Sequence, residues 1–231
     1  MSATLDTSAC PVPWWLPDRQ VQTLYGALAA PTHRLSFIRD RVDTPDSDFL
    51  DIDWSAPGLI AQPQNAGSLD TGHPTLEPRP DISTLKDTAA SRWMSESDRM
   101  VLSQAAPGTQ ALLLLHGLEG NSKSRYAQSI AQYFRARGWI VAVAHFRGCS
   151  GFPNRLARAY HSGDSHEVDF ILNTVRAMAP NAVWHAAGIS LGGNALLKYL
   201  GEYAQQSSWL KAAAGISVPL DLVAAGNHLS D

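Results

Sequence analysis

The stretch AVWHAAGISLGGNALLKYL, residues 182–200, constrains the fold more than any other part of the sequence. A short apolar run leads into a Gly-x-Ser-x-Gly motif centred on Ser190, and an apolar, helix-forming segment follows. This order predicts a strand, a sharp turn and a helix, which together raise a serine Oγ above the edge of a sheet. Gly188 and Gly192 fit that turn because a Cβ two residues from Ser190 would collide across it. We expect a serine nucleophile here, and the alternative is a serine in an ordinary glycine-rich turn.

A second motif, ALLLLHGLEGNSKSRY at residues 111–126, joins another apolar run to a polar loop. A serine on such a turn is typical of acyl-transfer hydrolases. In these enzymes one oxyanion-hole N–H comes from the residue after the nucleophile, and another comes from a loop that follows a neighbouring strand. These donors are expected to be the main-chain amides of Leu191 and Leu118, with Gly117 giving the loop its freedom. His116 precedes the serine in the chain, whereas the histidine of such triads follows it, so His116 is interpreted as a residue that shapes the loop.

Four blocks carry a family resemblance: HGLEG, HFRGCSGFPNR, YHSGD and GISLGGN, at residues 116–120, 145–155, 160–164 and 188–194. They resemble signature blocks of the YheT-like α/β-hydrolases, bacterial esterase-like proteins related to the eukaryotic ABHD lipases. VQTL at 21–24 and TPDSDFLDIDW at 44–54 resemble the family's lead-in helix and first hairpin. The resemblance covers residues 14–55 and 110–231. It implies hydrolysis of carboxylic esters, either acyl or lipid esters, through an acyl-enzyme on Ser190, with no cofactor.

The acid and the histidine of the triad are harder to find. The resemblance places both on later strands, but Asp221 and His228 are the main candidates here and lie only seven positions apart. A crossover between parallel strands needs at least about 10 residues, so the two are weak candidates for a triad. We therefore expect a chain truncated relative to its family, and a poor hydrolase. The alternative is a non-catalytic, hydrolase-like protein that binds a ligand or a partner.

The second half of the chain alternates between strand and helix patterns. Strands are expected at 111–115, 139–145, 183–187 and 212–218, and helices at 123–137, 165–178 and 191–205. This alternation predicts an α/β fold, a mostly parallel sheet with helices on both faces that lacks its last strands. Strand 212–218 would then be an apolar open edge through which the chain could self-associate.

Two helical stripes are expected to face the sheet. Tyr126, Ile130, Tyr133 and Phe134 form the first, and Val168, Ile171, Leu172 and Val175 form the second. Asp164 and Glu167 resemble a capping box at the start of the second helix.

Three regions are expected along the chain. Residues 1–55 hold a lead-in and a first hairpin, in which Phe49, Ile52 and Trp54 alternate with acidic positions. Residues 56–110 are rich in Pro, Gly, Ser and Asp and are expected to be a mobile insertion, with a short helix near 88–102. Residues 111–231 form the incomplete hydrolase core.

Two charged clusters leave alternatives open. HSGDSHE at 161–167 could suggest a metal site, but capping and the helix dipole explain its acidic residues, and no metal is expected. Arg147, Arg155 and Arg158 could hold a substrate phosphate or carboxylate, or could form ion pairs with Asp164 and Glu167.

Composition excludes other classes. A net charge of −3 gives no electrostatic case for nucleic acid. The two cysteines, Cys10 and Cys149, are far apart and do not form a metal or redox motif. The N-terminus lacks the features of a secretory signal, and no apolar run approaches the roughly 20 residues that span a bilayer. A reducing cytoplasm is the expected location, with a small ester or lipid as the substrate.

Overall fold

The computed structural model describes residues 11–26, 34–61, 81–82 and 89–230. Its contacts divide the chain into two compact units, residues 1–32 and 33–231. The first unit contains helix α1 (Arg19–Leu24), where Asp18 accepts a hydrogen bond from the Val21 N–H at 2.9 Å. The remaining elements belong to the second unit.

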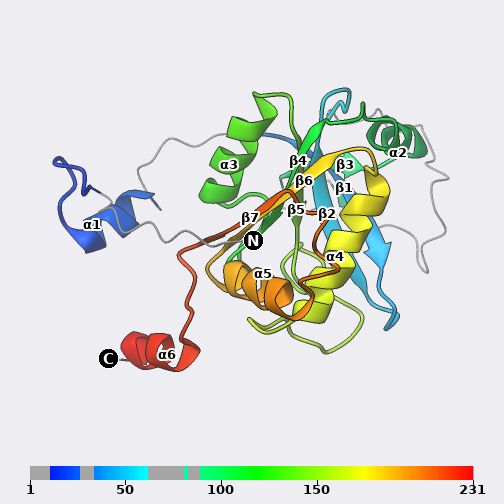
Figure 1. Ribbon diagram of the computed structural model, residues 1–231. Coiled ribbons are helices and arrows are strands. Elements are labelled where there is room, and N and C mark those ends of the chain that lie inside the picture. Colours follow the sequence, from blue (N-terminus) through cyan, green and yellow to red (C-terminus); the bar gives the residue numbers. More distant parts are fainter. Residues whose placement is uncertain (1–10, 27–33, 62–80, 83–88, 231) are drawn as a thin grey trace. The chain divides into compact units, whose positions relative to one another are not determined.

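A seven-stranded sheet forms the centre of the second unit, in the order β3-β1-β2-β5-β4-β6-β7 (Figure 1). β2 pairs antiparallel with β1 and with β5, whereas β5, β4, β6 and β7 run parallel. The mostly parallel α/β sheet expected from the sequence is therefore confirmed. The strands are β1 (Phe37–Asp43), β2 (Phe49–Ser55), β3 (Ala90–Trp93), β4 (Gln110–Leu115), β5 (Ile140–Ala144), β6 (Val183–Ile189) and β7 (Ala212–Ile216).

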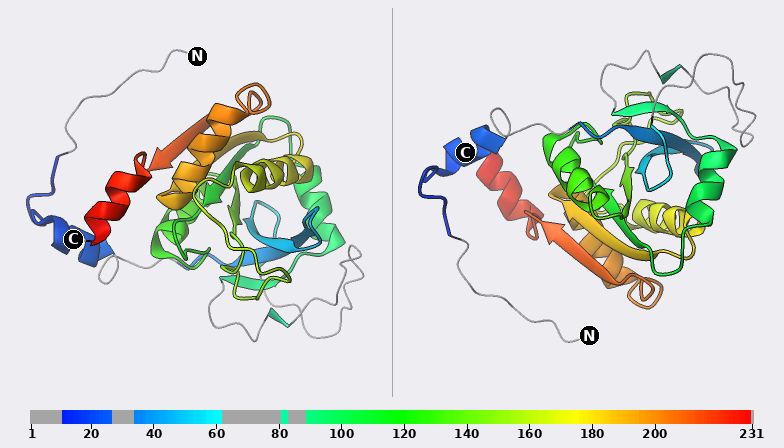
Figure 2. Two further views of the ribbon diagram at one scale, coloured as in Figure 1. Left: turned by 90° about the horizontal axis from the view of Figure 1, so that it is seen from below. Right: turned by 90° about the horizontal axis from the view of Figure 1, so that it is seen from above.

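Helices cover both faces of this sheet (Figure 2). Leu112 and Leu114 of β4 pack in one buried cluster with α3 (Arg125–Arg135), and Leu113 and Leu115 pack in another with α4 (Ser165–Met178) and α5 (Leu191–Glu202). Alternate side chains of a strand point to opposite faces, so a central strand with helices on both sides must be apolar throughout. This explains the uninterrupted leucine run of β4.

The expected helical stripes are correct in α4 and partly wrong in α3. Val168, Ile171, Leu172 and Val175 of α4 are fully buried. In α3, however, Tyr133 is 53% exposed, and the Arg137 guanidinium lies 3.4 Å from the centre of its ring. Small residues of α3, Ala127 and Ala131, make the close contact with the sheet instead.

The α4 capping box is also only half present. The Asp164 side chain accepts the N–H of Glu167 at 3.4 Å, as a helix N-cap does. The Glu167 carboxylate does not return this bond, because it binds Arg147 at 2.7 Å. A full capping box instead opens α2 (Glu96–Ser103), between Ser95 and Asp98.

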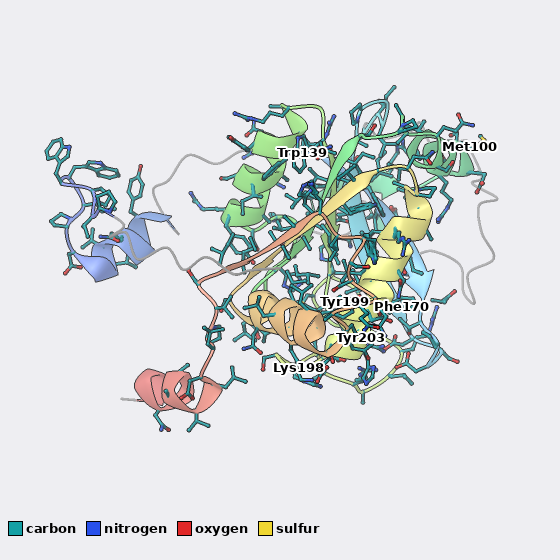
Figure 3. All side chains as sticks on the ribbon, viewed as in Figure 1. Met100, Trp139, Phe170, Lys198, Tyr199 and Tyr203 are labelled. Carbon is teal, nitrogen blue, oxygen red and sulfur yellow. The ribbon has the colours of Figure 1, made fainter. Side chains whose placement is uncertain are left out.

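Side chains of α4 and α5 pack together in the cluster that contains Leu113 and Leu115. Tyr199 of α5 is fully buried and stacks on Tyr203, with the ring centres 5.0 Å apart. Phe170 of α4 and Tyr203 both pack against the buried cluster that contains Tyr199, and Figure 3 labels all three residues.

The 56–110 stretch contributes to the core where the structure describes it. β3 pairs with β1 at one edge of the sheet. Leu102 of α2 is buried in the same cluster as Leu113 and Leu115. The short helix expected near 88–102 corresponds to α2, preceded by a strand that the sequence analysis did not identify. Residues 62–80 and 83–88 lie outside the described residues, and so does the mobility expected for them.

β7 forms the other edge of the sheet, as expected for 212–218, and all five of its residues are exposed. Helix α6 (Leu222–Ser230) follows it along the chain. None of the helices in the described parts of the chain has the length and apolar character that a membrane crossing requires.

Candidate active site

Ser190 lies in a strained turn between β6 and α5. Its φ of 51° and ψ of −115° fall where a residue with a side chain pays an energetic cost. The Ser190 N–H donates to the Ile216 carbonyl of β7 at 2.8 Å, which fixes the turn to the neighbouring strand. No partner for Ser190 Oγ occurs among the described residues, and the side chain is partly exposed. This is the geometry that presents a serine hydroxyl to a substrate.

Two glycines permit this turn, each in a different way. A Cβ on Gly188 would lie 2.5 Å from the Gly192 carbonyl oxygen and 2.6 Å from Gly193 Cα, across the turn as expected. A Cβ on Gly192 would instead lie 2.4 Å from the His116 carbonyl oxygen and 2.7 Å from that of Leu115. Gly192 therefore allows α5 to approach the end of β4, which is a different role from the one expected.

The loop after β4 reaches the serine. A Cβ on Gly117 would lie 3.4 Å from Ser190 Cβ and 3.4 Å from the Ile189 carbonyl oxygen. The two sequence motifs, separated by about seventy residues, therefore meet at the carboxyl ends of β4 and β6. Functional groups of parallel sheets gather at this edge.

Most amides of this loop already donate hydrogen bonds. The N–H groups of residues 117, 119, 120 and 121 donate, in that order, to Tyr126 Oη (3.1 Å), Tyr160 Oη (2.7 Å), Gly117 O (3.0 Å) and Ser124 Oγ (3.0 Å). Within the described residues, the N–H of Leu118 has no such acceptor. Leu191 is the first residue of α5, where main-chain N–H groups have no partner inside the helix. The amide of Leu118 in the loop and that of Leu191 at the start of α5 are thus available to donate to another group.

His116 is held as a neutral structural residue. It is fully buried, its Nδ1 lies 2.7 Å from the Gly117 carbonyl oxygen, and its Nε2 accepts the Phe146 N–H at 3.1 Å. Burial, with a smaller contribution from His145, lowers the pKa of His116 to about 3. With both ring nitrogens engaged, His116 is unsuited to accept a proton from Ser190.

The weak triad candidate Asp221, and the nearby carboxylate Glu202, form hydrogen bonds with groups other than Ser190 Oγ. The Asp221 carboxylate accepts the Ala224 N–H at 2.9 Å and so caps α6. His228 lies within α6, and its side chain is outside the described residues. Glu202 ends α5, where it pairs with Lys198 and accepts the Ser165 hydroxyl at 2.5 Å.

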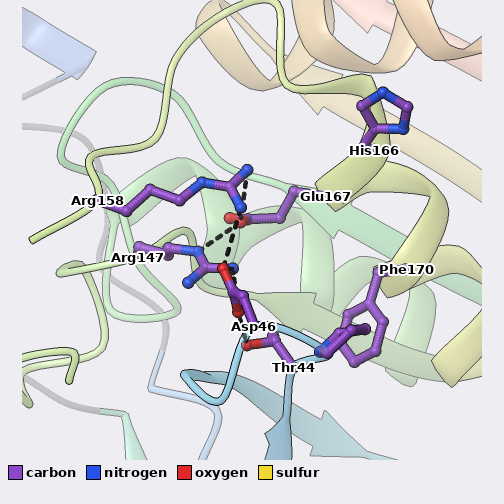
Figure 4. Close-up of a pocket in the computed structure, with 8 residues that line it drawn as sticks. Thr44, Asp46, Arg147, Arg158, His166, Glu167 and Phe170 are labelled. Carbon is purple, nitrogen blue, oxygen red and sulfur yellow. Dashed lines mark hydrogen bonds and ion pairs between the residues drawn. The ribbon is translucent and has the colours of Figure 1, made fainter. Parts of the chain in front are cut away.

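All three arginines have carboxylate partners. Arg147 binds Glu167 and Asp48, both at 2.7 Å, Arg158 binds Asp164 at 2.8 Å, and Arg155 binds Asp43 at 2.8 Å. Asp46 also contacts Arg147 and Arg158, and its pKa falls to about 2, first because Thr44 donates to it and then through Arg147. Asp46, Arg147, Arg158 and Glu167 are among the residues that line a cavity of about 190 Å³ between the β1–β2 turn and α4 (Figure 4). The ion-pair alternative is thus realised, and its acidic partners include the β1–β2 turn.

The polar side chains of the HSGDSHE segment already have partners within the protein. The His161 Nδ1 accepts the Gly163 N–H at 3.1 Å, and the His166 Nδ1 lies 2.7 Å from Tyr203 Oη. Its two carboxylates bind the arginines described above. The described residues contain no group of three or more potential metal ligands.

A buried polar network centred on Asp53 was not predicted from the sequence. Asp51 and Asp53 of β2 were expected to alternate with the core residues, yet every residue of β2 is buried. Arg39 of β1 binds Asp53 through two hydrogen bonds of 2.7 and 2.8 Å, and Ser122 and His145 also contact this carboxylate. The side chains of β2 do alternate, with Ile52 and Trp54 in the apolar cluster and Asp51 and Asp53 on the opposite face, but that face is covered as well. Arg39 and Arg41, which face these acids from β1, were the sequence feature that could have indicated buried ion pairs.

Comparisons with known proteins agree with this geometry. The chain is 39% identical over 118 residues to the candidate esterase YheT of Escherichia coli (strain K12), which is 51% of this chain and 34% of that protein. It is 30% identical over 134 residues to phospholipase ABHD3 of Homo sapiens, covering 58% of this chain and 32% of that protein. No family model matches the chain. The chain thus spans about a third of the length of these curated relatives.

Solved structures show the same fold. The esterase Pf2001 of Pyrococcus furiosus superposes with a TM-score of 0.52 at 12% sequence identity, over 85% of this chain and 54% of that one. At this identity the likeness concerns the fold alone. The chain therefore has the α/β-hydrolase fold, and its sequence is similar to the YheT-like esterases and the related ABHD lipases.

Proposed function

We propose that this chain carries the nucleophile and the oxyanion hole of a serine hydrolase that acts on carboxylic esters. The observation that supports this most is the Ser190 hydroxyl, raised on a left-handed turn beside the Gly117 loop. The main-chain amides of Leu118 and Leu191 are the proposed oxyanion-hole donors. The proposal uses no cofactor and no metal.

The reaction begins when Ser190 Oγ attacks the ester carbonyl carbon. The carbonyl π electrons move to its oxygen, which the Leu118 and Leu191 N–H groups stabilise, while a base takes the hydroxyl proton. The tetrahedral intermediate then expels the alcohol, which takes up a proton, and leaves an acyl-enzyme on Ser190. Water attacks this ester in the same way, releases the carboxylic acid and regenerates the serine.

The described residues bring no imidazole to Ser190 Oγ, and this absence sets the expected rate. An oxyanion hole and substrate binding without a complete triad typically retain about 10³ to 10⁴-fold acceleration over water. We therefore expect slow turnover by the chain alone. The chain covers only about a third of the length of these relatives, so ester hydrolysis by a full-length protein is proposed as well.

Acyl or lipid esters are the proposed substrates, since one relative is named a phospholipase and another a monoacylglycerol lipase. Arg158 is the arginine best suited to reach a substrate anion, because its side chain is 41% exposed. Arg147 is the least suited, because its buried guanidinium is already shared among three carboxylates. A cytoplasmic location stays a prediction from the sequence.

A fluorophosphonate probe tests the proposal, because it forms a covalent bond with an activated serine. We expect slow labelling of the wild type that maps to Ser190, no labelling of Ser190→Ala, and unchanged labelling of Ser103→Ala, which removes an exposed hydroxyl at the end of α2. Equal labelling of the wild type and Ser190→Ala would favour the alternative, a hydrolase-like protein that binds a ligand or a partner without catalysis.

A further inference from the structure

We propose that Asp53 is a positioning residue for the oxyanion hole, acting through Ser122 and His145 on both ends of the loop at residues 116–124. The inference rests on the proposed function, because the loop matters for catalysis only if Leu118 donates to an oxyanion. Asp53 lies on β2, more than sixty residues before the loop in the sequence.

The Asp53 carboxylate is completely buried and collects four donors. Arg39 provides two, through Nε at 2.7 Å and Nη2 at 2.8 Å, Ser122 Oγ donates at 2.5 Å, and His145 Nε2 lies at 2.9 Å. Burial alone would raise the pKa of Asp53, but Arg39 and then His145 outweigh it and hold the pKa well below its usual range. A buried carboxylate with four donors from different elements has a fixed position.

The first link connects Asp53 to the far end of the loop. Ser122 is fully buried, and its hydroxyl reaches across from the loop after β4 to the side chain on β2. The Ser122 carbonyl also accepts a hydrogen bond of 2.7 Å from Gln128 of α3. Ser122 is therefore held on both its side chain and its main chain.

The second link connects Asp53 to the beginning of the loop. His145 follows β5, and the next residue, Phe146, donates its N–H to His116 Nε2 at 3.1 Å. The ring centres of His116 and His145 are 6.1 Å apart. His116 immediately precedes Gly117, which lies against Ser190. The Asp53 carboxylate thus anchors the residues on either side of Leu118.

Substitution of Ser122 can distinguish a role of Asp53 in positioning the loop from a role in stabilising the fold. Arg39 and Asp53 form a complete bidentate pair without it, so the hydroxyl is an additional donor that ties the loop to an already paired carboxylate. Removing it leaves three donors on Asp53 and takes away the direct bond between this carboxylate and the loop, while the Gln128 bond to the Ser122 carbonyl remains. A misplacement of about 1 Å can reduce a catalytic rate about 100-fold, so a small shift of the Leu118 N–H should be measurable.

Fluorophosphonate inactivation of the full chain, fitted to a maximal rate and a half-saturating concentration, tests this inference. For Ser122→Ala we expect the maximal rate to fall about 10- to 100-fold, with the half-saturating concentration changed less than about twofold. The matched control is Ser91→Ala, which should leave both values unchanged. It removes a half-buried hydroxyl of β3, at the edge of the sheet opposite β7, that donates to the Ala61 and Phe37 carbonyls. Ser122→Cys keeps a weak donor and should be intermediate; if Ser122→Ala fails to fold, this variant carries the test.

Amide hydrogen exchange over residues 116–124 gives a second readout that needs no activity. We expect faster exchange in Ser122→Ala than in the wild type, and no change in Ser91→Ala. If the wild type is labelled no more than Ser190→Ala, the proposed function fails, while exchange still decides whether Ser122 orders the loop. Unchanged exchange and an unchanged inactivation rate in Ser122→Ala would overturn the inference.

Discussion

At the scale of single residues, the site depends on a tight turn at Ser190 in which a side chain at Gly188 would collide with the main chain. Ser190 occupies a left-handed conformation that costs energy, and the turn is possible because Gly188 has no Cβ to meet the backbone of Gly192 and Gly193. The hydroxyl is presented by this backbone geometry, and the N–H bond to Ile216 holds the turn on β7.

Substituting Gly188 with alanine should therefore destabilise the protein. The new methyl group would lie within 2.6 Å of three backbone atoms that cannot rotate away, so we expect a loss of about 1–3 kcal/mol in the free energy of unfolding. The matched control is Gly201→Ala on α5, where a Cβ meets nothing within 4 Å and helix propensity predicts a gain of up to about 1 kcal/mol. Urea denaturation of both variants measures this, and equal effects would contradict the steric account.

Sequence reasoning at this scale succeeded where a short motif sets local geometry. The turn at Ser190 and the clash at Gly188 follow from five consecutive residues. The contact of Gly192 with the end of β4 could not be predicted, because it joins segments about seventy residues apart. The same limit concealed Asp53, whose partners Arg39, Ser122 and His145 come from three other parts of the chain.

At the scale of elements, β2 shows how a strand can bury charge. It lies between β1 and β5, and every one of its residues is buried, including Asp51 and Asp53. Burying a carboxylate is favourable only when donors replace water, and Arg39 and Arg41 of the paired strand β1 supply them. The hairpin was predictable from the alternation in DFLDIDW, but the burial of its acidic face was not, because a sequence pattern does not show what covers a sheet.

Asp53→Asn should lower the free energy of unfolding by about 3–5 kcal/mol near neutral pH, because it removes the bidentate carboxylate from the buried Arg39 charge and leaves only Asp51, 3.9 Å away, as a counter-ion. The folded state depresses the pKa of Asp53, so its contribution is complete above the unfolded pKa of about 3.9 and is lost as the pH falls below that value. The difference between wild type and variant should therefore shrink on acidification.

Denaturation with urea between pH 3 and pH 7 measures this difference. Asp43→Asn is a suitable control, because it removes one partner of the partly exposed pair with Arg155 and should cost no more than about 1 kcal/mol. A constant difference across this pH range would contradict the account of Asp53.

At the scale of the whole molecule, the sheet ends in two different ways. β3 at one edge is short and followed by α2, whereas β7 at the other edge is exposed along its length and consists of alanine, glycine and isoleucine. Exposed apolar edge strands pair readily with other chains because their main-chain groups lack partners. The mostly parallel sheet with helices on both faces followed from the strand-helix alternation. The strand at 90–93 did not, because four residues give too weak a pattern.

We expect the chain to associate at increasing concentration through β7. Ala214→Lys places a charge in the middle of that edge and should shift the distribution towards the monomer, while Ser103→Lys on α2 adds the same charge elsewhere and should not. Sedimentation velocity at several concentrations distinguishes these variants. A wild-type chain that stays monomeric throughout would exclude the edge as an association surface.

The central claim is that Ser190 Oγ and the amides of Leu118 and Leu191 form one reaction site. A crystal structure of the chain after prolonged reaction with a fluorophosphonate tests it most directly, because the phosphonyl oxygen occupies the position of an oxyanion. The account predicts a covalent bond to Ser190 Oγ, with that oxygen about 2.7–3.1 Å from both amide nitrogens. An adduct whose oxygen points away from these amides, or a probe attached to another residue, would contradict it.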